Sequence, residues 1–159
     1  MVNVKLITLG TLKEAYLRDA AAEYEKRLGA FCKFELVQLK EERISDSPSE
    51  NEIKNVLDKE SEKIFEHISP RAFCIAMCVE GNQLSSEQLA DKLSNVMNTT
   101  GEICFVIGSS FGLSDKVKQR ADMRLSVSKL TFPHQLMRVI LLEAIYRAFN
   151  IQKGTKYHK

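Results

Sequence analysis

The sequence has no apolar run long enough to cross a lipid bilayer. Its longest apolar runs, such as the one from Ile103 to Gly108, are short, whereas a membrane-spanning helix needs about 20 apolar residues. No long apolar stretch follows Lys5 near the N-terminus, so we expect no secretory signal there. These absences predict a cytoplasmic protein with no membrane partner.

The chain also lacks the residue spacings of metal and redox sites. Its four cysteines are Cys32, Cys74, Cys78 and Cys104, and no two of them form a CxxC pair. They lie in apolar, strand-like segments, which favours reduced, buried thiols. The three histidines are scattered without a pair at metal-ligand spacing. We therefore predict that the protein binds no metal.

Linkers, internal repeats and low-complexity segments are absent as well. The 159 residues are 44% apolar and 28% charged, which is ordinary composition for a globular protein. A chain of this length suits one compact domain. We therefore expect a single domain over residues 1–159.

The net charge of +2 hides an uneven distribution. Residues 1–115 carry 13 Lys/Arg against 19 Asp/Glu, whereas residues 116–159 carry 10 Lys/Arg against 2 Asp/Glu. A basic C-terminal third on a nearly neutral protein suggests a polyanionic partner on one face. The alternative is a contact inside the fold that pairs the acidic part with the basic end.

Apolar residues follow strand-like and helix-like spacing in alternation along the chain. Residues 12–28 have helical spacing, and residues 71–79 form a nearly continuous apolar run, typical of a central strand covered on both faces. The alternation predicts an α/β fold: a mostly parallel sheet with helices on both faces. The expected strands are 2–9, 32–39, 71–79, 102–107 and 124–128, and the expected helices are 48–68, 85–98, 114–121 and 133–150 in addition to 12–28.

Two of the expected helices begin with capping patterns. Ser47 is followed by Pro48 and Glu50, and Ser85 is followed by Gln88. Both patterns fit an N-cap serine with a capping-box partner three residues on. Before the second of these helices, residues 80–82 predict a turn.

Ligands of parallel α/β sheets bind beyond the carboxyl ends of strands. This rule points to the segments after Val79, Ile107 and Ser128. Gly108 and Gly112 lie in the second segment, and glycine lets the backbone approach a ligand closely. The loop is neither a GxGxxG fingerprint nor a P-loop. It is therefore either a ligand loop of another kind or an ordinary strand-to-helix turn.

The third segment offers backbone groups and one histidine. Unpaired backbone groups of residues 127–132 could hydrogen-bond an adenine and a ribose, because they need partners in any case. His134 follows in the first turn of the last helix, where it faces either the loop or the core. On the same helix, Arg138 and Arg147 are nine residues apart, so they point in opposite directions and serve different partners.

The C-terminal tail combines a ring, a titratable base and cations. Tyr157 and His158 lie between Lys156 and Lys159. Such a set suits a nucleotide, because rings stack on bases and cations bind phosphates. The alternative is a frayed, solubilising tail.

Three segments together resemble the RlmH family of SPOUT-class 23S rRNA pseudouridine N3-methyltransferases. They are FVIGSSFGLS (105–114), LSVSKLTFPHQLMRVILLEAIYRAFNI (125–151) and the terminal YHK (157–159). The likeness covers the whole chain, including VKLITLGTLKEAYLRDAAAEYEKRL (4–28). It implies an α/β knot, in which the C-terminal segment threads a loop to form a trefoil. General topology rules would not predict a knot.

The resemblance also implies an activity and an assembly. The family transfers a methyl group from S-adenosylmethionine to a pseudouridine in helix 69 of 23S rRNA, on assembled ribosomes, and works as a homodimer with its active site at the subunit interface. By position, the substrate and catalytic residues are Tyr157, His158 and Lys159, and His134 matches the family's Pro-His. The cofactor-binding residues are Met77, Gly108, Val127, Ser128, Lys129, Leu130, Thr131 and Phe132.

One position departs from the family pattern. The family loop usually reads Gly-Gly-x-x-Gly, and this chain has Ser109 at the second position. If that position requires a positive φ, the serine costs about 1 kcal/mol or more. The loop otherwise accepts serine in an ordinary conformation.

The corresponding mechanism needs a base for the N3–H group of the target. A neutral His158 could accept this proton, Lys159 or Lys156 could stabilise the developing anion, and Tyr157 could stack on the base. A non-catalytic RNA-binding or ribosome-assembly module would also explain the charge distribution, but it would need no S-adenosylmethionine pocket. A dinucleotide enzyme would need a fingerprint and an acidic ribose ligand, and neither is evident.

Overall fold

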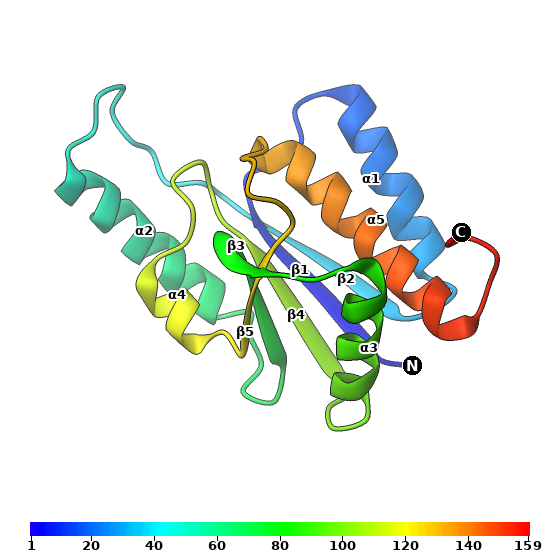
Figure 1. The fold of residues 1–159 in the computed structure, drawn as a ribbon. Coiled ribbons are helices and arrows are strands. Elements are labelled where there is room, and N and C mark those ends of the chain that lie inside the picture. Colours follow the sequence, from blue (N-terminus) through cyan, green and yellow to red (C-terminus); the bar gives the residue numbers. More distant parts are fainter.

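The computed structural model describes all residues from 1 to 159, which form a five-stranded sheet with every neighbouring pair of strands parallel (Figure 1). The strand order is β2-β1-β4-β3-β5. Strands and helices alternate as predicted, so the α/β fold is confirmed. The strands are β1 (Asn3–Leu9), β2 (Lys33–Leu39), β3 (Phe73–Gln83), β4 (Glu102–Ile107) and β5 (Met123–Ser126), and the helices are α1 (Ala15–Leu28), α2 (Glu50–Phe65), α3 (Ser86–Met97), α4 (Asp115–Arg120) and α5 (His134–Lys153).

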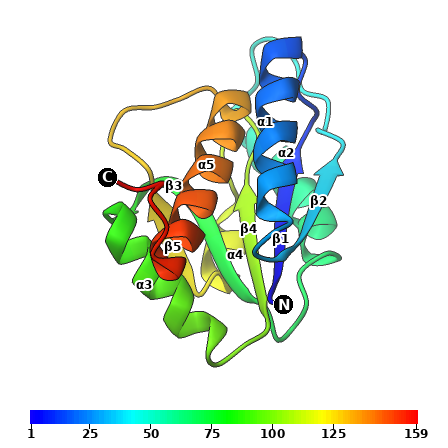
Figure 2. The ribbon, with the colours of Figure 1, turned by 90° about the vertical axis from the view of Figure 1, so that its right-hand side faces the viewer.

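Helices cover both faces of the sheet, as predicted. Helices α1, α5 and α3 pack on one face, with α5 between the other two (Figure 2), and α2 and α4 pack on the opposite face. Successive strand residues point to opposite faces, so Leu6 and Phe105 enter the first core, whereas Ile7 and Val106 enter the second. Burial on both sides explains why β4 reads as a continuous apolar run. None of the helices is long and apolar enough to span a membrane.

Helix α5 is longer than predicted. It runs to Lys153 and ends at Gly154, which has a left-handed conformation with φ of +67°. Glycine adopts this conformation at little cost and commonly ends helices. The predicted end at Asn150 was therefore three residues early, because the signal that ends the helix is the glycine.

One of the two predicted caps lies elsewhere. Ser49, not Ser47, caps α2 and accepts a hydrogen bond from the backbone N–H of Glu52 at 3.2 Å. Both serines have a glutamate three residues on, so the pattern alone did not separate them. The box of Ser85 and Gln88 is confirmed, since both of its hydrogen bonds form.

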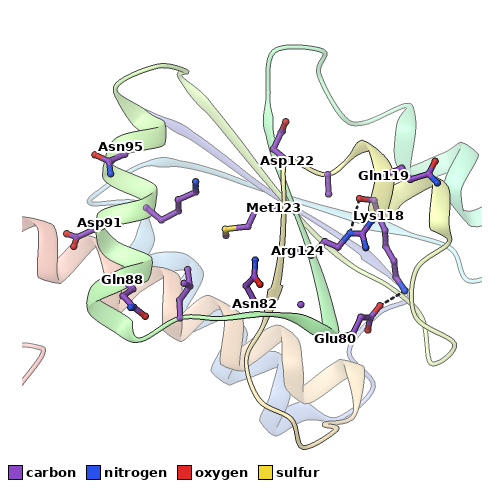
Figure 3. Close-up of a pocket in the computed structure, with 14 residues that line it drawn as sticks. Glu80, Asn82, Gln88, Asp91, Asn95, Lys118, Gln119, Asp122, Met123 and Arg124 are labelled. Carbon is purple, nitrogen blue, oxygen red and sulfur yellow. Dashed lines mark hydrogen bonds and ion pairs between the residues drawn. The ribbon is translucent and has the colours of Figure 1, made fainter.

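Strand β3 does not end where the sequence predicted a turn. It continues to Gln83, and Leu125 of β5 pairs with Met77 and again with Asn82. Between these two pairings the chain crosses β5, so Glu80 and Asn82 lie on either side of it (Figure 3). The chain does turn at residues 80–82, as predicted, but the predicted strand end at Val79 is wrong, because the residues after the turn find new backbone partners on β5.

The four cysteines are free thiols. Cys32, Cys74 and Cys104 are buried, as predicted, and Cys78 is half-buried. Burial raises the pKa of Cys104 to about 12 and that of Cys74 to about 11. These thiols are therefore protonated at neutral pH and pack as small apolar groups.

Candidate functional site

A pocket of about 590 Å³ lies at the carboxyl ends of β3, β4 and β5. These are the strand ends indicated by the ligand rule. Seven of the eight residues assigned to the cofactor by resemblance line the pocket, and Lys129 does not. His134 also lines it. The seven are Met77, Gly108, Val127, Ser128, Leu130, Thr131 and Phe132.

The glycine loop after β4 forms one wall and is tightly closed. A Cβ atom on Gly108 would lie 2.3 Å from the carbonyl oxygen of Gly112. Gly112 itself has a φ of +83°, a conformation that favours glycine. The loop is held by the N–H of Gly112, which donates to the carbonyl of Ser109 at 2.8 Å. Both glycines are therefore required, one by a close approach and the other by its backbone conformation.

Ser109 causes no backbone strain. No residue other than glycine has a positive φ, so the conformation that would penalise a serine does not occur at this position. Its side chain is buried and donates a hydrogen bond to Glu60 Oε1 at 2.9 Å. The departure from the family pattern thus gives the loop a contact that a glycine could not make.

Helix α2 supplies two residues near this loop that the sequence analysis missed. Glu60 and Ser61 are buried; Glu60 accepts from Ser109, and the Ser61 hydroxyl contacts the hydroxyl of Ser114, the N-cap of α4. A signal was present, because both residues lie one turn before the buried Ile64, on the inner stripe of the helix. A glutamate on such a stripe indicates a specific buried partner.

The loop after β5 forms the opposite wall. Ser126 donates to the carbonyl of Ser128, whose hydroxyl accepts from the N–H of Leu130, both at 3.0 Å. The N–H groups of residues 127–129, 131 and 132 donate to no group within the chain. They are available to a ligand.

Apolar side chains are exposed around the pocket mouth. Four of the seven large exposed apolar residues line this pocket: Val79, Phe111, Val127 and Leu130, the last 71% exposed. An apolar rim on a pocket marks a surface that a ligand or partner covers.

His134, which lines the pocket, lies beside an acidic side chain. Its Nε2 is 3.3 Å from Glu41 Oε1. On the same helix, the buried Arg138 donates to Gln38 Oε1 at 2.8 Å and to the carbonyl of Gly10 at 3.0 Å. Burial lowers the pKa of Arg138. Arg138 thus links α5 to the ends of β1 and β2.

The C-terminal tail is folded back on α5 instead of frayed, and it does not line the pocket. The Tyr157 hydroxyl donates to Glu143 at 3.0 Å, and burial together with this bond raises the pKa of Tyr157 to about 12. His158 Nδ1 lies 3.1 Å from Arg147 Nη1, and its Nε2 lies 2.7 Å from Glu87 Oε1. Because arginine can only donate, Nδ1 accepts, and Nε2 donates to Glu87. Lys159 remains exposed.

Arg138 and Arg147 serve different partners, as predicted from their spacing. Arg147 pairs with Glu143 at 2.6 Å, and its guanidinium lies over the Tyr157 ring. The hydrogen bond to Glu143 raises the pKa of Arg147. Arg147 thus belongs to the tail contacts, whereas Arg138 belongs to the interior.

The basic residues of the C-terminal third do not form one face. Lys116, Lys118 and Arg120 lie on α4, on one face of the sheet, while Lys156 and Lys159 follow α5 on the other (Figure 1). The Lys118 ammonium pairs with Glu80 at 2.6 Å, and this hydrogen bond lowers the pKa of Glu80. The prediction of a single basic face is therefore wrong, because the fold separates α4 from the tail.

A second, larger cavity of about 810 Å³ lies beside the crossing of β3 and β5 (Figure 3). Its lining is mainly polar, with carboxamides such as Asn82 and Gln119 and charges of both signs. It shares Glu80 and Lys118 with the first pocket, but it contains no residue assigned to the site by sequence. No group of three or more His, Cys, Asp or Glu side chains is arranged to hold a metal ion.

Comparisons with known proteins match the sequence of this chain to methyltransferases. A family model described as "Predicted SPOUT methyltransferase" matches residues 2–158. Proteins named "Ribosomal RNA large subunit methyltransferase H" from Streptococcus thermophilus, Bifidobacterium adolescentis and Bacillus pumilus are 52%, 50% and 47% identical, and each alignment covers 99% of this chain and 100% of the relative. A solved structure, a probable methylase family protein from Haemophilus influenzae Rd KW20, has a TM-score of 0.54 at 15% identity, covering 98% of this chain and 70% of that chain. At that identity, the likeness concerns the fold alone.

Proposed function

We propose that this chain, which belongs to the SPOUT methyltransferase family, methylates large-subunit ribosomal RNA with S-adenosylmethionine as the methyl donor. The pocket at the carboxyl ends of β3, β4 and β5 carries this proposal, because it brings together seven of the eight residues that the resemblance assigns to the cofactor. The substrate class is supported by relatives of about half identity over their whole length that are named ribosomal RNA methyltransferases.

The pocket fits such a cofactor in size and in chemistry. Its volume of about 590 Å³ lies within the range of roughly 300–1,000 Å³ typical of small-molecule sites. The unpaired N–H groups of residues 127–129, 131 and 132 would hydrogen-bond the adenine and ribose, and Met77 and Gly108 would contact the cofactor from β3 and β4. S-adenosylmethionine supplies a sulfonium methyl that is already electrophilic, so the chain has to supply orientation and a deprotonated acceptor.

The proposed acceptor is N3 of a pseudouridine in helix 69 of 23S rRNA on the assembled ribosome. Residues 1–159 form one sheet covered by helices on both faces, and such an enzyme would read a preformed shape, which an assembled ribosome provides. His158 would accept the N3 proton, Lys159 would stabilise the resulting anion, and Tyr157 would stack on the base. The reaction would take place in the cytoplasm, where ribosomes are.

The proposed active site is shared between two copies of the chain. Tyr157, His158 and Lys159 do not line the pocket of their own chain, so a second copy would bring its tail to the pocket mouth. The exposed apolar rim, which includes Phe111 and Leu130, supports such a covering. To act as a base, His158 would have to exchange its hydrogen bond from Arg147 for one from the target N3–H.

The crossing of β3 and β5 supports the family's threaded topology. The chain passes over β5 at Gly81, where a Cβ atom would lie 2.8 Å from the backbone of Leu125. The trefoil knot itself stays a prediction.

Methyl transfer from labelled S-adenosylmethionine to ribosomes that lack the modification tests the proposal, with free rRNA alongside. We expect label in the large-subunit RNA of the ribosomes and none in the free RNA. Label in neither, from protein that binds S-adenosylmethionine, would overturn the activity. Ribosome binding without any cofactor binding would favour a non-catalytic assembly module.

A further inference from the structure

Glu60 is a buried acid that the proposed mechanism leaves unused. It lies on α2, with only 2% of its surface exposed. A buried carboxylate is costly unless hydrogen bonds compensate it. Glu60 accepts two, from the Ser109 hydroxyl at 2.9 Å and from the backbone N–H of Glu42 at 3.3 Å. The shorter bond comes from the pocket loop.

The loop leaves Ser109 little room to move. Ser109 follows Gly108, lines the pocket and accepts from the N–H of Gly112 at 2.8 Å. Gly108 in turn lies directly against the backbone of Gly112. A rotation or shift of Ser109 would therefore change the shape of the wall made by residues 108–112.

We propose that Glu60 is a positioning residue for the cofactor site, acting through Ser109 to hold the loop 108–112 in the shape that receives S-adenosylmethionine. The inference rests on the proposed function. Glu60 does not line the pocket, so its effect on binding passes through the Ser109 hydroxyl. Helix α2 thereby contributes to a site otherwise built from the strand ends.

A neighbouring bond provides a matched control. Ser61, next to Glu60 on α2, contacts the Ser114 hydroxyl at the start of α4. Both bonds join α2 to the segment after β4, and neither Ser61 nor Ser114 lines the pocket. Losing the Ser61 contact therefore removes a buried bond between the same parts of the molecule without removing the bond to the loop.

Calorimetric titration with S-adenosylmethionine tests the inference. The proteins to be titrated are wild type, Ser109→Ala, Glu60→Ala, their double variant and Ser61→Ala. We expect a rise of fivefold or more in Kd for each of the first two variants. The double variant should be no weaker than the weaker single variant, because both substitutions remove the same contact. Ser61→Ala should lower the melting temperature and leave Kd within twofold of wild type. In the methyl-transfer assay, Ser109→Ala should raise KM for S-adenosylmethionine by a larger factor than it lowers kcat.

The outcomes separate this inference from the proposed function. No binding by the wild type would overturn the proposed function. Binding by the wild type with an unchanged Kd in Ser109→Ala would overturn the positioning role alone. The positioning role would also be overturned if the effects of the two substitutions on Kd multiplied in the double variant, or if Ser61→Ala raised Kd as much as Ser109→Ala does. Glu60 would then affect binding only through the general stability of the fold.

Discussion

At the residue scale, the pocket loop depends on the presence or absence of single side-chain atoms. Gly108 has no space for a Cβ atom, because the carbonyl of Gly112 occupies it. The next residue, Ser109, has space for a hydroxyl and a buried acceptor for it in Glu60. The same loop therefore requires a glycine at one position and uses a serine at the next.

Replacing Gly108 with alanine should open the loop and weaken cofactor binding. The added Cβ would lie 2.3 Å from the Gly112 carbonyl oxygen, so that the backbone must move. We expect Kd for S-adenosylmethionine to rise by roughly tenfold or more, which corresponds to about 1.4 kcal/mol or more. Calorimetric titration measures it. Gly101→Ala is the control, since its Cβ would meet nothing within 4 Å; equal affinities of the two variants would contradict the prediction.

The buried carboxyl of Glu60 should make stability depend on pH. Burial raises the pKa of the Glu60 carboxyl above the ordinary 4.5, and the charge of nearby Glu41 also raises it. The hydrogen bonds from Ser109 and Glu42 and the charge of Lys63 lower the pKa, but burial has the largest effect. The folded state then holds the proton more tightly than the unfolded chain, so stability is lost as the pH rises from 4.5 through the folded pKa.

Glu60→Gln should remove this pH dependence. The free energy of unfolding of the wild type, measured with urea at several pH values, should fall relative to that of Glu60→Gln as the pH rises from about 4.5 to about 7. Glu62→Gln, on the exposed side of the same helix, is the matched control. If the difference in unfolding free energy between wild type and Glu60→Gln stayed constant with pH, folding would not shift the pKa of the Glu60 carboxyl.

At the element scale, β3 and β5 form two separate pairings. β3 pairs with β5, passes over it and pairs with it again. Residues at this crossing line both the first pocket and the polar cavity, which share Glu80 and Lys118. A change at the crossing should therefore affect the folded state as a whole.

Replacing Gly81 with alanine should destabilise the protein. The added Cβ would lie 2.8 Å from the Leu125 carbonyl carbon and 2.9 Å from that of Arg124. Backbone atoms cannot rotate away as a side chain can, so we expect a loss of about 1–3 kcal/mol or more in unfolding free energy. Urea denaturation measures this loss. Unchanged stability would mean that the two strands separate easily at the crossing.

At the scale of the whole molecule, the residues proposed for the reaction are divided between two places. The pocket lies at the strand ends, whereas the tail lies along α5 and reaches Glu87 on α3. In the folded-back tail, both ring nitrogens of His158 are engaged, by Arg147 and by Glu87. The proposed dimer would bring the tail of one copy to the pocket of the other.

Mixing two impaired variants tests this arrangement. When the S-adenosylmethionine concentration is held well below its Kd for Gly108→Ala, the pocket of that variant should be mostly empty, and His158→Ala should reduce turnover by roughly a hundredfold or more with little change in cofactor affinity. If the tail serves the partner's pocket, a mixed dimer has one intact site, and random mixing should restore about a quarter of wild-type methyl transfer. His67→Ala, outside the proposed site, controls for the loss of a histidine. No restoration after verified subunit exchange would place tail and pocket in the same chain.

The sequence by itself determined the α/β class, the order of the elements and the strand ends that form the pocket. These follow from local regularities: apolar spacing, glycines after strands and the capping pattern at Ser85. The predicted bounds differ from the observed ones by no more than three residues, except at the end of β3. The resemblance added the cofactor residues, seven of which share one pocket.

Only the tertiary structure decided which distant side chains meet. Glu60 and Ser109 are far apart in the chain, and so are His158 and Glu87. The second pairing of β3 with β5 likewise depends on a crossing that strand spacing does not record. Nor could charge alone show that the basic C-terminal third divides between two faces. A local pattern reports which side of a helix or strand is buried, but the partner of a buried polar group is set by how the elements pack together.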